Sequence, residues 1–199
     1  MKIARDVSDL PTFSFGPRTL TWWGTLGFMA LEGSGFVLAA GSYLYLMTLA
    51  PKWPLNAPQP DAWPGTIVAI LLLLSMPLNI VLGRWAKACD LGKVRLGLVG
   101  MSLLGVAPLI VRCFEFPALN VSWDSNAYGS IVWFLLALHS THLLTDVGDT
   151  LVLTALMFTR HGRNGRRFSD VSDNVFYWDF VVLTWLPIYF VLYWLPRLA

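Results

Sequence analysis

Four ionisable side chains follow one another along one apolar stretch of the chain: His139, His142, Asp146 and Asp149. On an α-helix, which turns by about 100° per residue, they fall within an arc of about 80°. Imidazole and carboxylate groups bind zinc, copper or iron, and they also relay protons. The pattern lacks the Glu that stands between the two His of a zinc-protease helix. The stripe is therefore compatible with a buried polar seam, a proton or water path, or a metal site.

A carboxyl group interrupts an earlier apolar stretch. Glu32 lies ten residues after Trp22, and His139 lies ten residues after Gly129, where two apolar stretches begin. Both positions are therefore about 15 Å into a helix. An ionised side chain in mid-bilayer costs about 2.5–3.5 kcal/mol or more, so both should face protein or water. We expect Glu32 and His139 to lie within hydrogen-bonding reach; the alternative is a protonated Glu32 that bonds a nearby carbonyl.

Three further charged side chains lie inside apolar stretches. Arg112 and Glu115 are three residues apart, which is typical of an ion pair on a helix surface. A site for a lipid headgroup or a partner subunit is the alternative for that pair. Asp179 lies about 7.5 Å into the last stretch, at the level of Asp146 and Asp149. These three carboxylates are expected either to gather near the inner face or to pair with arginines.

The composition identifies the elements that must position these groups. Of 199 residues, 56% are apolar and 13% are charged, against the roughly 25% charged residues of soluble domains. A membrane-spanning helix needs about 20 mostly apolar residues, and barrel strands are about half as long. Five stretches qualify as helices: about 22–49, 66–85, 96–116, 129–158 and 174–195. The sequence predicts an all-α polytopic membrane protein, with a tail over residues 1–21 and a five-helix domain over residues 22–199.

Positive charges in the connections predict the orientation, because cytoplasmic loops are rich in Lys and Arg. The tail and the second and fourth connections hold most of them, whereas the first and third connections hold only Lys52. This pattern predicts a cytoplasmic N-terminus, an outer C-terminus and a multi-pass protein of the bacterial inner membrane. Arginines at the inner ends of the spans are candidates for lipid headgroups: Arg84, Arg160, Arg163, Arg166 and Arg167. A net charge of only +2 gives no reason to expect nucleic acid as a partner.

Several short motifs, taken in order, resemble the cytochrome c oxidase subunit III family. They are Glu32 in a helix that ends at Leu49-Ala50-Pro51, Pro77-Leu78-Asn79, Glu115, Tyr128-Gly129-Ser130, His139-Ser140-Thr141-His142, and Tyr177-Trp178 followed by Trp185, Tyr189, Tyr193 and Trp194. The resemblance covers about residues 22–194 and is closest to the five-helix form of the family. Asp146 stands where the family usually has Gly, and Asp179 stands where it has His.

The resemblance implies a subunit without a redox centre that packs on the catalytic subunit I of a haem-copper oxidase. It also implies subunit II and further respiratory subunits as partners, haem and copper in those partners, and bound phospholipid. The subunit would support proton uptake and the durability of the active site. A subunit III-like partner of a nitric oxide reductase is a possible divergent branch. The competing class is a free-standing membrane metalloenzyme or proton-coupled transporter that uses the stripe of His139, His142, Asp146 and Asp149.

Overall fold

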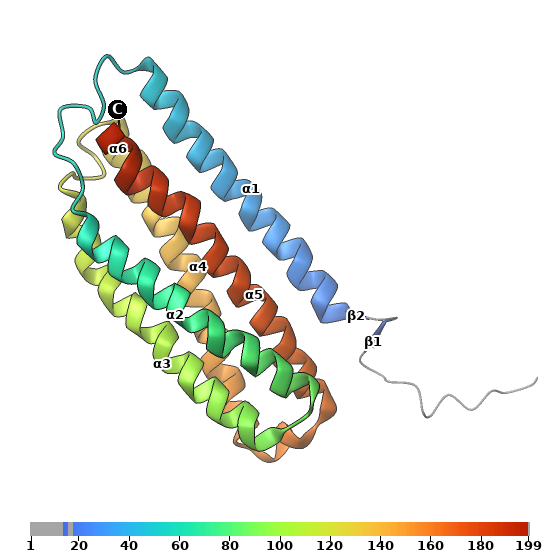
Figure 1. Cartoon of the computed structure of the whole chain (residues 1–199). Helices are drawn as coiled ribbons and strands as arrows, with labels where there is room; N and C mark the ends of the chain where they lie inside the picture. The colour runs from blue at the N-terminus through green and yellow to red at the C-terminus, as the bar shows by residue number, and fades with distance from the viewer. Residues whose placement is uncertain (1–13, 16–17, 199) are drawn as a thin grey trace, which may run out of the picture.

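The computed structural model describes residues 14–15 and 18–198 (Figure 1). Five long helices follow one another: α1 (Leu20–Leu49), α2 (Ala62–Lys87), α3 (Leu91–Glu115), α4 (Ala127–Met157) and α5 (Gly165–Tyr189). Shorter elements are the paired strands β1 (Ser14–Phe15) and β2 (Arg18–Thr19), η1 (Pro117–Leu119), η2 (Arg160–Arg163), the π-helical turn η3 (Phe190–Trp194) and α6 (Leu195–Leu198). The prediction of an all-α fold is confirmed for the described residues, apart from this two-residue hairpin.

Helices α2 to α5 form a bundle, and α1 lies along one edge of it. Helix α2 packs against α3 and α5, while α4 packs against α3 and α5. Helix α1 packs against α4 and α5, and it runs beside them in Figure 1. Helix α2 therefore belongs to the same bundle as α3, α4 and α5, and α1 lies outside it.

Four segments among the described residues are long and apolar enough to cross a membrane: α2, α3, α4 and the continuous helical run Gly165–Leu198. The protein is thus a multi-pass membrane protein. Helix α1 corresponds to the first predicted span but is not among these four segments. Its membrane crossing and the orientation of the termini remain predictions.

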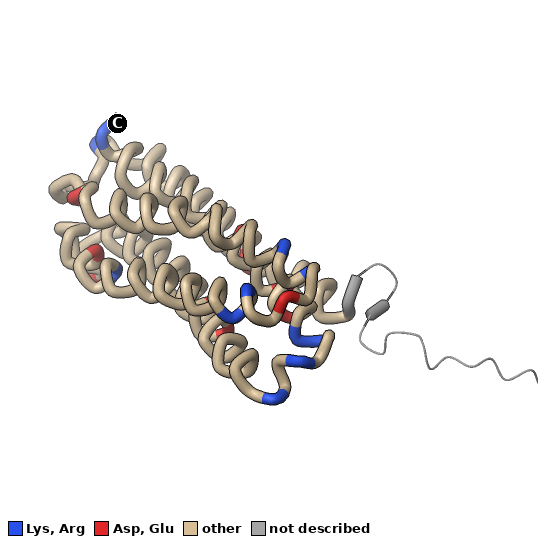
Figure 2. Tube along the Cα trace, turned by 60° about the horizontal axis from the view of Figure 1, so that its bottom comes forward, with Lys and Arg blue, Asp and Glu red and all other residues tan. Residues whose placement is uncertain are grey.

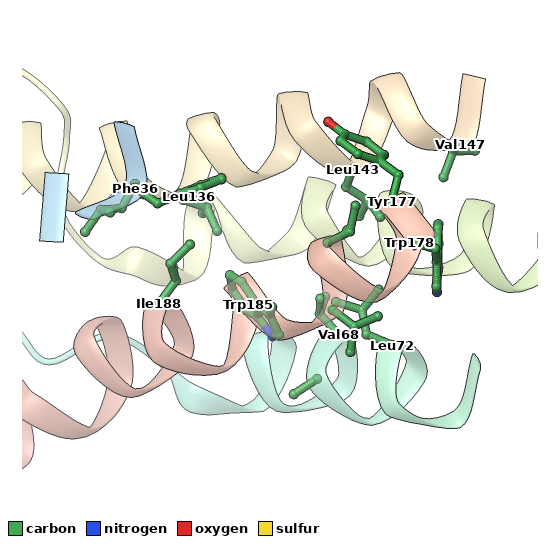
Figure 3. Close-up of a cluster of buried hydrophobic side chains, with 14 of the residues drawn as sticks. Phe36, Val68, Leu72, Leu136, Leu143, Val147, Tyr177, Trp178, Trp185 and Ile188 are labelled. Atoms are coloured by element: carbon green, nitrogen blue, oxygen red, sulfur yellow. The ribbon is translucent and has the colours of Figure 1, made fainter. Parts of the chain in front are cut away.

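The helices meet around aromatic side chains of α5. Trp178 and Trp185 are fully buried, and Figure 3 shows them in one cluster with side chains from α2 and α4. The indole of Trp178 donates a hydrogen bond to Ser75 on α2 at 2.8 Å. Gly105 brings α3 close to this cluster, since a Cβ there would lie 3.2 Å from the Trp178 ring. Small residues and indole rings thus set the spacing of the bundle.

The proline-rich connection between α1 and α2 closes one end of the bundle. Its backbone amide at Asp61 donates to the Ala118 carbonyl at 2.8 Å, and Arg197 donates to the Pro60 carbonyl at 2.6 Å. The connection therefore links the C-terminus to the turn between α3 and α4.

Most Lys and Arg gather at the opposite end, where the α2–α3 and α4–α5 turns lie (Figure 2). Asp90 caps α3 there by accepting a hydrogen bond from the Lys93 amide at 3.2 Å. The hydrogen bond between the Lys93 and Asp90 side chains holds the pKa of Asp90 below its ordinary value. Cys89 in this turn and Cys113 on α3 are both free thiols.

The close approach of α2 to η3 gives a test of the packing. A Cβ on Gly65 would lie 2.3 Å from the Tyr193 ring, which is itself fully buried. Gly65→Ala should therefore destabilise the protein by about 1–3 kcal/mol, the usual range for an overpacked core. Gly148→Ala is the matched control, because nothing lies within 4 Å of its Cβ position. Thermal unfolding in detergent should show a lower midpoint for Gly65→Ala only; equal midpoints would contradict the packing.

Candidate functional site

The polar stripe of α4 does not converge on one centre. Its side chains have different partners at successive levels: His139 bonds Arg112 on α3, His142 faces Glu32 on α1, and Asp146 bonds Asn174 on α5. The stripe is thus a seam that ties α4 to three neighbouring helices. No three His, Cys, Asp or Glu side chains of the described residues are arranged to hold a metal ion.

The first level is a buried ion pair within α3. The Arg112 Nη1 atom lies 2.5 Å from Glu115 Oε2, and the two side chains are 3% and 0% exposed. The sequence correctly predicted the pair, but its placement on the helix surface is wrong. The three-residue spacing fixes only that the two groups share a face, and here α4 and α5 cover that face.

Three further side chains contact this ion pair, and Arg112 Nε has no hydrogen-bond partner among the described residues. Tyr193 donates to Glu115 Oε1 at 2.5 Å, and the Arg112 guanidinium lies over the Trp185 ring at 3.8 Å from its centroid. Arg112 Nη2 lies 2.7 Å from His139 Nδ1. Removing both charges from water is costly, so such a pair persists only when hydrogen bonds and close contacts surround it.

These contacts determine the tautomer of His139. A guanidinium only donates hydrogen bonds, so Nδ1 must accept from Arg112 and the ring proton must be on Nε2. Nε2 then donates to the Val181 carbonyl on α5 at 3.1 Å. Both ring nitrogens are therefore engaged, and His139 is a neutral bridge between α3 and α5.

The second level joins α1 to the bundle. The Tyr177 hydroxyl donates to Glu32 Oε2 at 2.5 Å, and His142 Nε2 lies 3.4 Å from the same oxygen. The His142 contact is in ion-pair range, but neither ring nitrogen of His142 makes a hydrogen bond to any described residue. Phe36 and Phe180 pack beside this imidazole, at centroid distances of 5.4 Å and 5.2 Å.

The predicted contact between Glu32 and His139 is therefore wrong, because the partner of Glu32 on α4 is His142. The two histidines are three residues apart, which is nearly one helical turn and about 4.5 Å along the helix axis. The axial position of α1 relative to α4, which was estimated by counting residues from the ends of the spans, was therefore wrong by about this distance. His139 in any case has no free nitrogen for a carboxylate.

The third level is a pair of carboxylates on α4 that share one amide. Asn174 Nδ2 donates to Asp146 Oδ1 at 3.0 Å and to Asp149 Oδ2 at 3.2 Å. Thr150 donates to Asn174 Oδ1 at 3.2 Å, so the orientation of the amide is fixed. Asp146 is 1% exposed, and its Oδ2 has no hydrogen-bond partner in the described part of the chain.

Asp179 does not join these carboxylates. Its Oδ1 accepts a hydrogen bond from Asn79 on α2 at 2.8 Å, and the same amide also bonds the Val175 carbonyl. Asp179 lies five residues after Asn174, which is about 140° around the helix. The predicted gathering of three carboxylates is therefore wrong: Asp179 faces α2, while Asn174 faces α4.

A cavity of about 620 Å³ lies between the first turns of α1, on the N-terminal side of Glu32, and the facing parts of α4 and α5. Asp146, Asp149 and Tyr177 line it on one side. The α1 wall consists of Thr21, Gly24, Thr25 and Phe28. Of the arginines predicted to meet lipid headgroups, Arg167 pairs with Asp170 at 2.8 Å and lines the cavity. The other four are exposed: Arg84, Arg160, Arg163 and Arg166.

Several residues of the site were not singled out from the sequence for these roles. Asn174 and Asn79 are neutral amides, and nothing in a single sequence distinguishes an amide that bonds a buried carboxylate from one that faces water. Tyr177 and Tyr193 were noted only as part of a family motif, although a hydroxyl beside a predicted intramembrane acid is a reasonable partner for it.

The family model that describes cytochrome c oxidase subunit III matches residues 60–197, which is more than half of the chain. The chain belongs to the cytochrome c oxidase subunit III family. The match runs from the end of the proline-rich connection to α6, so it includes Arg112, Glu115, His139 and His142 but not Glu32.

Individual relatives are distant. The chain is 26% identical over 155 residues to cytochrome c oxidase subunit 3 of Rhizopus stolonifer, a match over 73% of this chain and 54% of that protein. It is 28% identical over 100 residues to the Drosophila yakuba subunit 3, covering 49% of this chain and 37% of that protein. The chain thus spans between a third and just over half of these two relatives. The match to the Anopheles gambiae subunit 3 is longer, at 24% identity over 96% of this chain and 76% of that protein.

The buried ion pair of this subunit III family member can be tested by removing one or both charges. Arg112→Leu leaves Glu115 buried without its counter-charge, which should cost about 3–5 kcal/mol of folding stability. Arg112→Leu combined with Glu115→Leu should cost less than the single change, because no lone buried charge remains. Thermal unfolding midpoints decide this; a double variant less stable than Arg112→Leu would contradict the account.

The contact of Glu32 with Tyr177 predicts graded effects of substitution. Glu32→Ala removes the acceptor and should release α1 from α4 and α5, whereas Glu32→Gln keeps an amide oxygen for the hydroxyl and should be milder. Limited proteolysis of the connection between α1 and α2 would report the loosening of α1. A Gln variant as damaging as Ala would instead indicate that the titrating proton of Glu32 matters.

Proposed function

We propose that this chain is a non-redox subunit III of a haem-copper terminal oxidase in aerobic respiratory electron transport. The observation that carries the proposal is the match of the family model over residues 60–197. In this proposal the chain packs on catalytic subunit I, has subunit II and further respiratory subunits as partners, and leaves haem and copper to those partners.

The distribution of polar groups supports a scaffold role. The ionisable side chains on α3 and α4 bond their neighbours within the bundle, as Arg112 does with Glu115 and His139. Groups that are engaged in this way hold helices together, and their substitution changes stability before it changes any chemical step. A rigid subunit of this kind would support proton uptake and the durability of the active site in the neighbouring catalytic subunit.

Phospholipid binding and orientation are part of the same proposal. The exposed arginines at the α2–α3 and α4–α5 turns would meet the phosphates of anionic headgroups, and their position favours the cytoplasmic side. We therefore propose a cytoplasmic N-terminus, an outer C-terminus and the bacterial inner membrane as the location. Five crossings, with α1 as the first, complete this topology.

Co-purification tests the proposal. A tagged full-length chain, extracted in mild detergent from aerobically grown cells that express it naturally, should bring haem-bearing partners whose reduced-minus-oxidised spectrum shows haem bands. The chain produced alone should show no such absorption. A subunit recovered from its own membranes without haem-bearing partners would contradict the proposal, and a stoichiometric metal held by His139 and His142 would favour a metalloenzyme.

A further inference from the structure

One carboxylate within the membrane-spanning run of α5 lies on a face that the bundle leaves exposed. Asp179 is partly exposed, and three apolar side chains follow it at intervals of four, three and four residues, each 39–59% exposed: Leu183, Leu186 and Phe190. Residues at such intervals share one side of a helix. This side is a continuous apolar strip that begins with a carboxylate.

The strip lies between α1 and α2, and Figure 1 shows α5 running between these two helices. Asp179 bonds Asn79 on α2. The next residue, Phe180, faces α1, since a Cβ on Gly33 would lie 3.6 Å from its ring. The cavity described above is lined by α1, α4 and α5, so the strip is a separate surface of the protein.

Asp179 has no counter-charge among the described residues. The Asn79 amide donates to its Oδ1 at 2.8 Å, and this amide is neutral. The carboxylates that form ion pairs in the described part of the chain are those of Asp90, Glu115, Glu32 and Asp170. An ionised side chain in hydrocarbon is costly, and intramembrane acids almost always face the protein interior, water or an opposite charge.

The depth of Asp179 makes this cost relevant. Asp179 lies 14 residues after Gly165 and 19 residues before Leu198, which is near the middle of the run that is long and apolar enough to cross a membrane. Its partner Asn79 lies five residues before Arg84, which places it about 7.5 Å farther from the end of α2 that carries Arg84. A group that neutralises Asp179 must therefore be held within the hydrocarbon layer.

We propose that this strip of α5 docks a transmembrane helix of a partner subunit that presents a lysine or an arginine to Asp179. The cationic side chain donates to Oδ2, while Oδ1 keeps its bond from Asn79. Leu183, Leu186 and Phe190 pack against the apolar side of the partner helix. The inference rests on the proposed role of this chain as a subunit, and it adds the docking face and the chemistry of the partner.

A partner helix fits this site better than a lipid does. A lysine or arginine fixed on a helix can lie at any depth, whereas the amine of a lipid headgroup lies at the membrane surface and would have to sink into the hydrocarbon. The outer face of α3 provides the comparison. Leu96, Leu103 and Ile110 follow one another there at seven-residue intervals, are 58–71% exposed, and have no ionisable residue between them in the sequence. That face matches lipid chains alone.

Co-purification of haem-bearing partners tests the charge. The tagged full-length chain replaces the natural copy in its own cells, and the haem recovered per chain is measured after extraction in mild detergent. Asp179→Asn keeps an oxygen for the Asn79 amide but removes the charge, so recovery should fall about tenfold, as for the loss of one member of a buried charge pair. Asp149→Asn is the matched control, because it is the same chemical change on the α4 side of α5, and it should recover as much haem as the wild type.

The outcomes separate this inference from the proposed function. A wild-type chain that brings haem-bearing partners, together with an Asp179→Asn chain that brings as many, would overturn the docking site and leave the proposed function intact. A wild-type chain without such partners would contradict the proposed function itself and would remove the basis of this inference.

Photo-crosslinking identifies the occupant and decides if Asp179→Asn does not fold. Benzoylphenylalanine in place of Leu183, illuminated in native membranes, should link to a polypeptide whose cross-linked segment is an apolar helix with a lysine or arginine. Benzoylphenylalanine in place of Leu103 on α3 is the control and should link to lipid only. A cross-link from position 183 to lipid alone, or to a second copy of this chain, would overturn the proposal.

Discussion

The buried pair of Arg112 and Glu115 is the constraint on which one end of the bundle depends. A guanidinium and a carboxylate removed from water are tolerated only if every neighbouring group is placed to satisfy them. Tyr193 must reach Glu115, His139 must present Nδ1, and Trp185 must offer its ring face to Arg112. One ion pair on α3 thereby fixes the rotation of α4 and α5. It also fixes the position of Tyr193, whose ring lies against Gly65 on α2.

Helix α1 is held against the bundle by other contacts. It lies at the edge of the bundle and packs against α4 and α5. Its polar contacts among the described residues include those of Glu32 with Tyr177 and His142 in the middle, and that of Tyr43 with Trp53 of the following connection, at 2.9 Å. Between hydrocarbon-embedded helices the hydrophobic effect contributes little, so packing and such hydrogen bonds hold them together. A helix held at a few points leaves space elsewhere, and the cavity at the other end of α1 is that space.

The bundle stabilises buried charged side chains in two different ways, at the ion pair and at the cavity. At the Arg112 end each charge has an opposite charge in contact, and aromatic rings close the gaps. At the Asp146 end two carboxylates share an amide, and one oxygen of Asp146 has no hydrogen-bond partner among the described residues. The first arrangement makes a rigid structural tie. The second joins α4 to α5 through the Asn174 amide alone, so substitutions at the two ends should have different consequences.

The number of long helices and the approximate bounds of the first four could be predicted from the sequence, because turn-forming residues separate the apolar runs. Helix α5 begins at Gly165, nine residues before the predicted start at residue 174, because its first turns are polar. The sequence by itself also determined that His139, His142 and Asp146 share one face of α4, and that Arg112 pairs with Glu115, because such relations lie within a single helix and follow from its period. The family resemblance could likewise be predicted from the ordered motifs.

Which side chains meet between helices, in contrast, follows only from the three-dimensional packing. A shift of one turn, about 5.4 Å, is longer than a hydrogen bond, and no pattern within a helix fixes its rotation or its axial position relative to a neighbour. Glu32 therefore meets His142, Asp179 meets Asn79, and Asn174 joins Asp146 to Asp149, each through the packing of helices that are distant in sequence.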